Sequence, residues 1–145
     1  MLRDETKAPI LIHEHDAGML TDNDSNLSVM SVPLRPLEPF EPDLLLKGHE
    51  KLSYAGFEID VIPTPGHTSG GVCFLFREQK ALFSGDTLFR ESFGRYDFPD
   101  GSLRDLRESL LSTLFSLEGD FYVYPGHGDC TTLQHERERN PIRFY

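Results

Sequence analysis

The chain has 145 residues, of which 38% are hydrophobic and 26% are charged, a composition typical of one folded domain with a single apolar core. Its 24 acidic residues outnumber its 14 basic residues, so the formal net charge is -10. A surface this acidic repels phosphate backbones and anionic lipids, which argues against nucleic acid and membrane as partners.

The sequence also limits the compartment. No apolar run approaches the roughly 20 residues of a membrane-spanning helix. Residues 1–7 are of mixed charge and lack the apolar segment of a secretory signal. Two cysteines, Cys73 and Cys130, do not make a disulfide framework. We therefore expect one domain over residues 1–145, in the cytoplasm.

The first half of the chain favours strands. Residues 8–12 are short, apolar and partly β-branched, which predicts a buried strand. Residues 21–42 contain four prolines and predict a long loop. Residues 57–62 alternate apolar and polar side chains, as a half-buried strand does. Residues 72–76 and 81–84 resemble the two arms of a hairpin.

The second half contains the clearest helix, in which leucines at helical spacing follow Ser102 and end before Gly119. Residues 121–124 predict another strand. A last helix is predicted to begin near Thr131, with Gln134 completing a capping box, and to end before Pro141. This mixture of strands and helices indicates an α/β or α+β layer fold.

Three of the predicted strands run directly into a potential metal ligand. His67, Asp86 and His127 each follow an apolar strand and lie beside glycine. Strand ends in a layered sheet tend to meet at one crevice, where two imidazoles and a carboxylate suit Zn²⁺, with Mn²⁺ or Fe²⁺ as alternatives. Each segment taken singly is more typical of an ordinary turn, whereas the three together favour a metal site.

These segments carry a family resemblance over nearly the whole chain. The sequence resembles the metallo-β-lactamase superfamily, and more closely its glyoxalase II-like branch, the hydroxyacylglutathione hydrolases. The matching segments are Thr64–Gly71, Leu82–Phe89, Gly94–Pro99, Tyr124–Gly128 and the stretch from Thr131 to Pro141.

The resemblance implies an αββα sandwich with a site for two metals, usually zinc. It implies that His67 binds the first metal, that Asp86 bridges both as the catalytic carboxylate, and that His127 binds the second. A bridging hydroxide would then attack the carbonyl of a small-molecule thioester. Arg95 occupies a position where relatives place a basic residue near the substrate, although a surface arginine that braces its loop is an equally good reading.

The sequence also departs from the family. The His-x-His-x-Asp-His loop, expected before residue 8 together with strands of the first sheet, is absent, and so is the C-terminal helical extension of glyoxalase II. We therefore expect an incomplete fold that corresponds to its C-terminal two-thirds, weak or partial metal occupancy, and self-association through an exposed sheet edge. A shortened chain or misplaced start codon, an inactive natural remnant, and a chain completed by a partner all explain this; we favour the first.

The leading prediction is a metal-dependent hydrolase of the glyoxalase II-like kind, impaired in this chain as it stands. One alternative is a persulfide dioxygenase-like protein with one iron, against which the segment Tyr124–Gly128 argues. The other is a non-catalytic, degenerate domain. The acyl group, the role of glutathione, the metal and the oligomeric state stay open.

Overall fold

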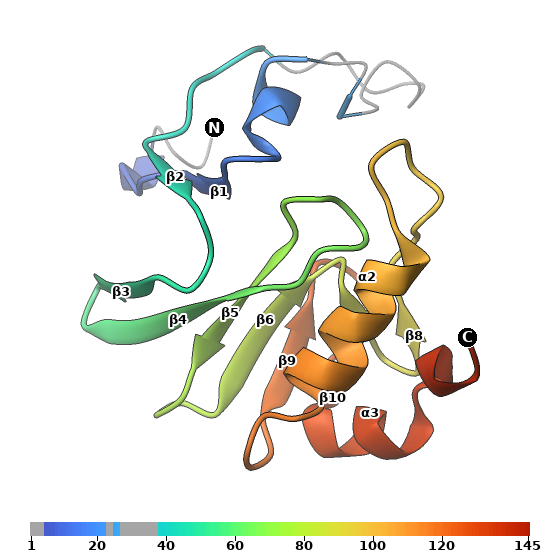
Figure 1. Ribbon diagram of the computed structural model, residues 1–145. Coiled ribbons are helices and arrows are strands. Elements are labelled where there is room, and N and C mark those ends of the chain that lie inside the picture. Colours follow the sequence, from blue (N-terminus) through green and yellow to red (C-terminus); the bar gives the residue numbers. More distant parts are fainter. Residues whose placement is uncertain (1–4, 23–24, 27–37) are drawn as a thin grey trace. The chain divides into compact units, whose positions relative to one another are not determined.

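The computed structural model describes residues 5–22, 25–26 and 38–145, and the chain divides into two compact units, Met1–Lys47 and Gly48–Tyr145 (Figure 1). The prediction of one domain over residues 1–145 stays a prediction. Much of the predicted loop over residues 21–42 lies outside the described residues. Among those described, none of the helices combines the length and apolar character needed to cross a bilayer.

The first unit contains a short parallel pair of strands. β1 (Leu11–His13) begins three residues later and ends one residue later than the strand predicted over 8–12, and it pairs with β2 (Leu44–Leu46). A single turn of 3₁₀ helix, Ala17–Leu20, follows β1. The sequence gives no sign of the pairing, because the two strands are separated by a proline-rich stretch and joined only through tertiary contacts.

The second unit is built on a six-stranded mixed sheet in the order β10-β9-β6-β5-β4-β3. Its strands are β3 (Lys51–Tyr54), β4 (Phe57–Pro63), β5 (Val72–Phe76), β6 (Ala81–Gly85), β9 (Tyr122–Pro125) and β10 (Thr131–Thr132). Neighbours are antiparallel except for β6 and β9, which are parallel. The predicted alternating strand and the predicted hairpin are both confirmed, as β4 and as β5 with β6.

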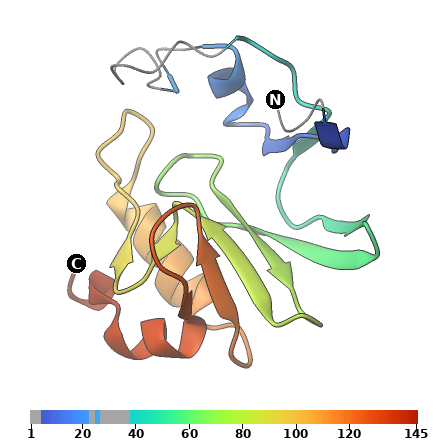
Figure 2. The ribbon, with the colours of Figure 1, turned by 180° about the vertical axis from the view of Figure 1, so that it is seen from behind.

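Helices cover one side of this sheet (Figures 1 and 2). α2 (Leu103–Glu108) starts at Ser102, whose hydroxyl accepts a hydrogen bond from the backbone N–H of Asp105 as predicted. It continues as a π-helical segment, Ser109–Leu114, and α3 (Leu133–Arg139) and a 3₁₀ turn, Pro141–Phe144, end the chain. A small hairpin of β7 (Leu88–Phe89) and β8 (Ser92–Phe93) precedes α2.

The core lies between the helices and the sheet. Leucines of α2 and the π-helical segment pack against the buried side chains of β5, β6 and β9; these residues are Leu106, Leu110, Leu114, Cys73, Leu75, Leu82 and Val123. All seven are fully buried. The predicted α/β class is therefore confirmed, and the helical leucine pattern identifies the correct face of the helix.

The predicted start of the last helix is wrong in detail. The side chain that caps α3 is Thr132, which accepts a hydrogen bond from the backbone N–H of His135, and not Thr131. Thr131 lies in β10, and its hydroxyl donates to the buried carboxylate of Glu136 instead. The capping-box spacing to Gln134 favours Thr131, but its hydroxyl bonds Glu136 and Thr132 caps the helix in its place.

Candidate functional site

Three strands of the second unit end at the same edge of the sheet. β4 and β6 are each antiparallel to β5, and β9 is parallel to β6, so β4, β6 and β9 all run in one direction. His67, Asp86 and His127 follow the carboxyl ends of these three strands. The topology therefore brings three chemically active side chains from distant parts of the sequence to a common edge.

Asp86 lies between the two imidazoles. Its Oδ2 is 3.8 Å from Nε2 of His67, and its Oδ1 is 3.8 Å from Nε2 of His127. The Asp86 side chain is 38% exposed, that of His67 is 23% exposed and that of His127 is 74% exposed. Each carboxylate oxygen thus faces a different histidine at a separation too long for a hydrogen bond.

The orientation of the His67 ring is fixed by contacts on the side of the ring away from Asp86. Its Nδ1 is 2.8 Å from the backbone carbonyl oxygen of Arg95. A carbonyl can only accept a hydrogen bond, so Nδ1 carries a proton and Nε2 is the ring nitrogen that faces Asp86. The ring of Phe98 packs edge-on against the same imidazole, with centroids 5.4 Å apart. Metal-binding histidines are commonly held in this way.

Two glycines permit the close approach of the loops around Asp86. A Cβ atom on Gly126 would lie 2.3 Å from Oδ1 of Asp86, and one on Gly94 would lie 1.9 Å from the Asp86 carbonyl oxygen. The backbone N–H of Gly126 also donates to the carbonyl of Gly85 at 2.8 Å. Any larger residue at 94 or 126 would displace the segment that carries the carboxylate.

The loop that carries His67 is packed onto the start of α2. The backbone N–H of Ser102 donates to the carbonyl of Gly66 at 2.8 Å, and the Ser109 hydroxyl donates to the carbonyl of Pro65 at 2.8 Å. Gly66 has a φ of 138° and lies so close to the backbone of Leu106 that a Cβ atom there would be 2.3 Å from its nitrogen. The loop position is therefore set by the helix as well as by β4.

The donor set fits a divalent cation in part. A separation of 3.8 Å is less than the sum of two ligand bonds of about 2.0–2.2 Å each, so a cation fits between each imidazole and its carboxylate oxygen. Nitrogen and carboxylate oxygen are the ligands that Zn²⁺, Mn²⁺ and Fe²⁺ accept. The described residues contain no group of three His, Cys, Asp or Glu side chains that could hold one ion.

Arg95 contributes its backbone to the site, while its side chain is occupied elsewhere. Its guanidinium donates two hydrogen bonds of 2.9 Å to the carboxylate of Asp97 and lies 4.5 Å from the centroid of the Phe98 ring. These hydrogen bonds raise the pKa of Arg95 and lower the pKa of Asp97. The guanidinium is exposed, and it already has an acidic partner.

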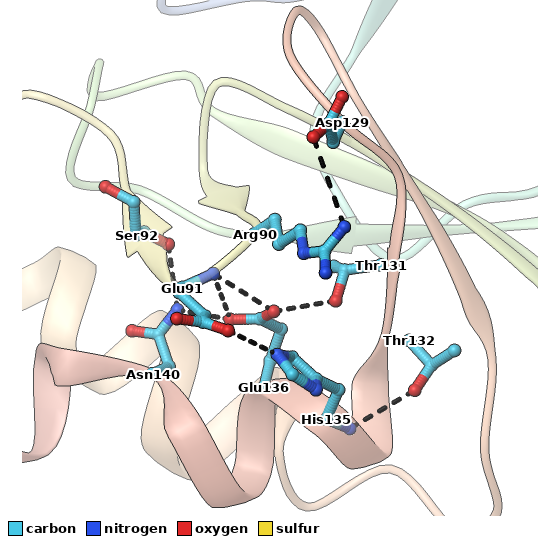
Figure 3. Close-up of polar contacts among 9 residues, drawn as sticks. All are labelled: Arg90, Glu91, Ser92, Asp129, Thr131, Thr132, His135, Glu136 and Asn140. Carbon is cyan, nitrogen blue, oxygen red and sulfur yellow. Dashed lines mark hydrogen bonds and ion pairs between the residues drawn. The ribbon is translucent and has the colours of Figure 1, made fainter.

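A second polar cluster lies under β10 and α3 (Figure 3). The carboxylate of Glu136 is fully buried and accepts hydrogen bonds from the Glu91 backbone N–H at 3.0 and 3.1 Å, from the Thr131 hydroxyl at 2.7 Å and from the Asn140 amide at 2.8 Å. It joins α3, β10 and the turn between β7 and β8. Sequence analysis gives this residue no role, because one of its three partners is a backbone N–H 45 residues away in the chain.

A shallow groove runs along the outer edge near this second cluster. It has a volume of about 400 Å³ and is lined by Arg90, Tyr122, Cys130, Thr131, Thr132 and His135. None of the three predicted metal ligands lines it. Arg90 and Asp129 are 4.0 Å apart at the groove, and His135 pairs with Glu91 at 2.9 Å (Figure 3).

Comparison with known proteins identifies the family to which the chain is similar. A family model described as the metallo-beta-lactamase superfamily matches residues 1–127. A probable metallo-hydrolase of Streptococcus pyogenes is 39% identical over 141 residues, which cover 92% of this chain and 59% of that protein. The hydroxyacylglutathione hydrolase GloC of Haemophilus influenzae is 39% identical over 93 residues, which cover 64% of this chain and 44% of that protein.

Solved structures give the same result for the fold. The BLEG-1 B3 metallo-beta-lactamase matches with a TM-score of 0.89 and 32% identity, over 97% of this chain and 68% of its own. TTHA1623, whose crystal structure is of a di-iron-bound form, matches with a TM-score of 0.69 and 34% identity over the same shares. The chain spans about three-fifths of the length of the first curated relatives it matches.

Proposed function

The chain belongs to the metallo-beta-lactamase superfamily, and from this premise we propose that it contributes to a metal-dependent hydrolase that cleaves small-molecule thioesters. The observation that carries the proposal is the placement of one carboxylate, Asp86, with an imidazole nitrogen 3.8 Å from each of its oxygens. The similarity to a hydroxyacylglutathione hydrolase, whose named substrate class is a thioester, supports the choice of bond.

In this proposal Asp86, His67 and His127 would hold the metal, and Asp86, which lies between the two imidazoles, would contribute to binding on both sides. Zinc is the first choice of metal, and iron and manganese are alternatives; the di-iron form of TTHA1623 supports iron. A bound cation would supply Lewis-acid polarisation of the thioester carbonyl and would lower the pKa of a coordinated water. One terminal ligand per cation makes retention weak, so we expect low occupancy and slow turnover in this chain.

The other residues of the site act by orienting the candidate ligands. The carbonyl of Arg95 holds the His67 ring, and the rings of Phe98 and Phe89 pack on the imidazoles of His67 and His127. The guanidinium of Arg95, once released from Asp97, is proposed to contact the anionic end of the substrate.

The test is hydrolysis of S-lactoylglutathione by the chain loaded in turn with Zn²⁺, Mn²⁺ and Fe²⁺. We expect metal-dependent release of the thiol that Asp86→Asn abolishes. The matched control is Asp60→Asn. Asp60 lies on β4, and its carboxylate pairs with Arg77 and not with His67, Asp86 or His127. Absence of thioester cleavage with all three ions, equal cleavage by Asp86→Asn, or oxygen consumption with glutathione persulfide instead would contradict the proposal.

A further inference from the structure

Three buried polar side chains are bonded to one another beside the two turns that carry His67 and Asp86. Thr64 follows β4 and precedes His67 by three residues, and Thr87 directly follows Asp86 in the turn after β6. Cys73 lies on β5, the strand between β4 and β6 (Figure 1). Thr64 and Cys73 are fully buried, and Thr87 is 3% exposed. Each of the three groups has therefore lost its water and depends on a protein partner.

The hydrogen bonds of these groups form one continuous network. Oγ1 of Thr64 is 3.2 Å from Oγ1 of Thr87 and 3.3 Å from Sγ of Cys73. The Cys73 thiol donates to the backbone carbonyl of Ser84 at 3.7 Å. The backbone N–H of Thr87 donates to the same carbonyl at 3.0 Å. The network therefore starts at Thr87, just after Asp86, passes through the other two strands and returns to the end of β6.

The direction of each hydrogen bond in the network follows from its last acceptor. The Ser84 carbonyl can only accept, so it takes the single proton of the Cys73 thiol. The Cys73 sulfur is then the acceptor for the Thr64 hydroxyl. That bond uses the one proton of Thr64, so the Thr87 hydroxyl is the donor to Thr64 Oγ1. Each of the three protons thus has one defined acceptor.

Stability alone gives little reason for a hydroxyl pair at this place in the core. Replacing two bonded hydroxyls by methyl groups of the same shape is nearly neutral for folding. A hydrogen bond differs from an apolar contact because it fixes both a distance and a direction. The bond between Thr64 and Thr87 therefore fixes the turn after β4 relative to the turn after β6.

We propose that Thr64 and Thr87 are positioning residues that set the separation between His67 and Asp86. This inference rests on the proposed function, because it concerns two ligands of the metal that the hydrolase would use. The two threonines act through the backbone of the turns and do not contact the metal. Their hydrogen bond holds Nε2 of His67 3.8 Å from Oδ2 of Asp86, the separation that leaves room for a cation.

Zinc titration and urea denaturation of the same variants of the full chain test the proposal. Thr64→Val and Thr87→Val keep the shape of the side chain and remove the hydroxyl, so we expect zinc affinity to fall about tenfold. Thr64→Ser and Thr87→Ser keep the hydroxyl and remove a methyl group. The midpoint of urea denaturation should then fall, while zinc affinity stays within about twofold of the parent.

The double variant Thr64→Val/Thr87→Val separates positioning from stability. Thr64→Val alone leaves the buried Thr87 hydroxyl without its acceptor, whereas the double variant removes both hydroxyls, so its urea midpoint should recover toward the parent. Zinc affinity should stay as low as in the single variants. Thr131→Val is the matched control, because this buried hydroxyl bonds Glu136 and neither of the two turns. It should lower stability and leave zinc affinity unchanged.

A measurement without metal keeps this inference distinct from the proposed function. In NMR spectra of the apo chain, Thr64→Val should shift the amide signal of Asp86 and Thr87→Val should shift the imidazole signals of His67, whereas the serine variants should retain both. Absence of zinc binding by the parent would overturn the proposed function, and the apo spectra would still decide the role of the threonines. Valine variants with the apo signals of the parent, or a double variant in which zinc affinity recovers together with stability, would overturn the inference.

Discussion

Asp86 and Glu136 are two carboxylates of the same unit that the chain treats in opposite ways. Glu136 is fully buried, and four short hydrogen bonds from Glu91, Thr131 and Asn140 saturate both of its oxygens. Asp86 is part-exposed, and in the described part of the chain its oxygens face two imidazoles at 3.8 Å with no hydrogen bond between them.

The difference in burial and hydrogen bonding indicates a structural role for Glu136 and suggests that Asp86 is available to a ligand. A buried carboxylate is retained at acceptable cost only when protein donors replace all of the water it loses. A carboxylate oxygen that lies 3.8 Å from an imidazole nitrogen makes no hydrogen bond to it, and this separation leaves room for a cation between them. We therefore propose that Asp86 is available to an external ligand, whereas the protein itself supplies the hydrogen-bond donors of Glu136.

The largest expected effect is on stability, at the closed carboxylate. Glu136→Ala leaves the Thr131 hydroxyl, the Glu91 N–H and the Asn140 amide buried without their acceptor, and we expect a loss of about 3–5 kcal/mol in the free energy of unfolding. Urea denaturation measures it. Glu138→Ala, on the exposed side of α3, should cost less than about 0.5 kcal/mol. Similar losses in Glu136→Ala and Glu138→Ala would contradict the structural role assigned to the buried carboxylate.

The two thiols also differ in burial, because Cys73 is buried and Cys130 is exposed. Burial raises the pKa of Cys73 from 9.0 to about 11, against smaller opposing effects of hydrogen bonds from Thr64 and Thr87. Between these values the unfolded chain has released a proton that the folded chain keeps. This contribution to stability is therefore complete below pH 9 and is lost as the pH rises through 11, by about 2–3 kcal/mol.

Denaturation of the parent and of Cys73→Ala between pH 8 and 10.5 checks this prediction. The parent should lose stability with pH more steeply than the variant, in which that proton is missing. In the same preparation at pH 8, iodoacetamide should modify the exposed Cys130 and leave Cys73 unreacted. Equal pH slopes, or alkylation of both thiols in the folded chain, would contradict the assigned environments.

A smaller effect is expected at the glycine that touches Asp86. Gly126→Ala places a Cβ atom 2.3 Å from Oδ1 and must move the carboxylate or its loop. We expect zinc affinity to fall about tenfold while the fold is retained, because a displaced ligand weakens the metal site more than it weakens the core. Gly18→Ala, where a Cβ atom meets nothing within 4 Å, is the control in the same dialysis experiment.

The smallest effect is expected at Arg95. The contact to His67 comes from its backbone carbonyl, which a side-chain substitution retains. Arg95→Gln should therefore leave zinc affinity within about twofold of the parent, whereas it should raise KM for an anionic thioester in an active preparation. A large loss of zinc affinity would show that the guanidinium and its pairing with Asp97 also support the metal site.

Sequence reasoning reaches the parts of the structure that local patterns encode. The helix after Ser102 has a capping hydroxyl and leucines on one face, and β4 has a period of two, so both are predictable. The placement of three candidate ligands directly after three strands is also visible in the sequence. The contacts that orient these residues are not visible in the sequence. The tautomer of His67 depends on the backbone carbonyl of residue 95, which a residue of any type would supply.

Other features escape prediction for a related reason. The alternation of β4 does not say which side of the sheet the helices cover, because that side is decided by the packing of α2. The choice of Thr132 over Thr131 as helix cap depends on the buried Glu136. The π-helical hydrogen bond from Phe115 to the Leu110 carbonyl has no sequence signature of its own. In each case a tertiary contact decides between local alternatives.

Asp86 is proposed to be a ligand of the metal. The most direct measurement is a zinc titration of the apo chain followed by calorimetry, in parallel for the parent, Asp86→Asn and Asp60→Asn. The account predicts zinc binding by the parent and by Asp60→Asn, with at least about 100-fold weaker binding by Asp86→Asn. Zinc binding of the same affinity and stoichiometry in Asp86→Asn would contradict it.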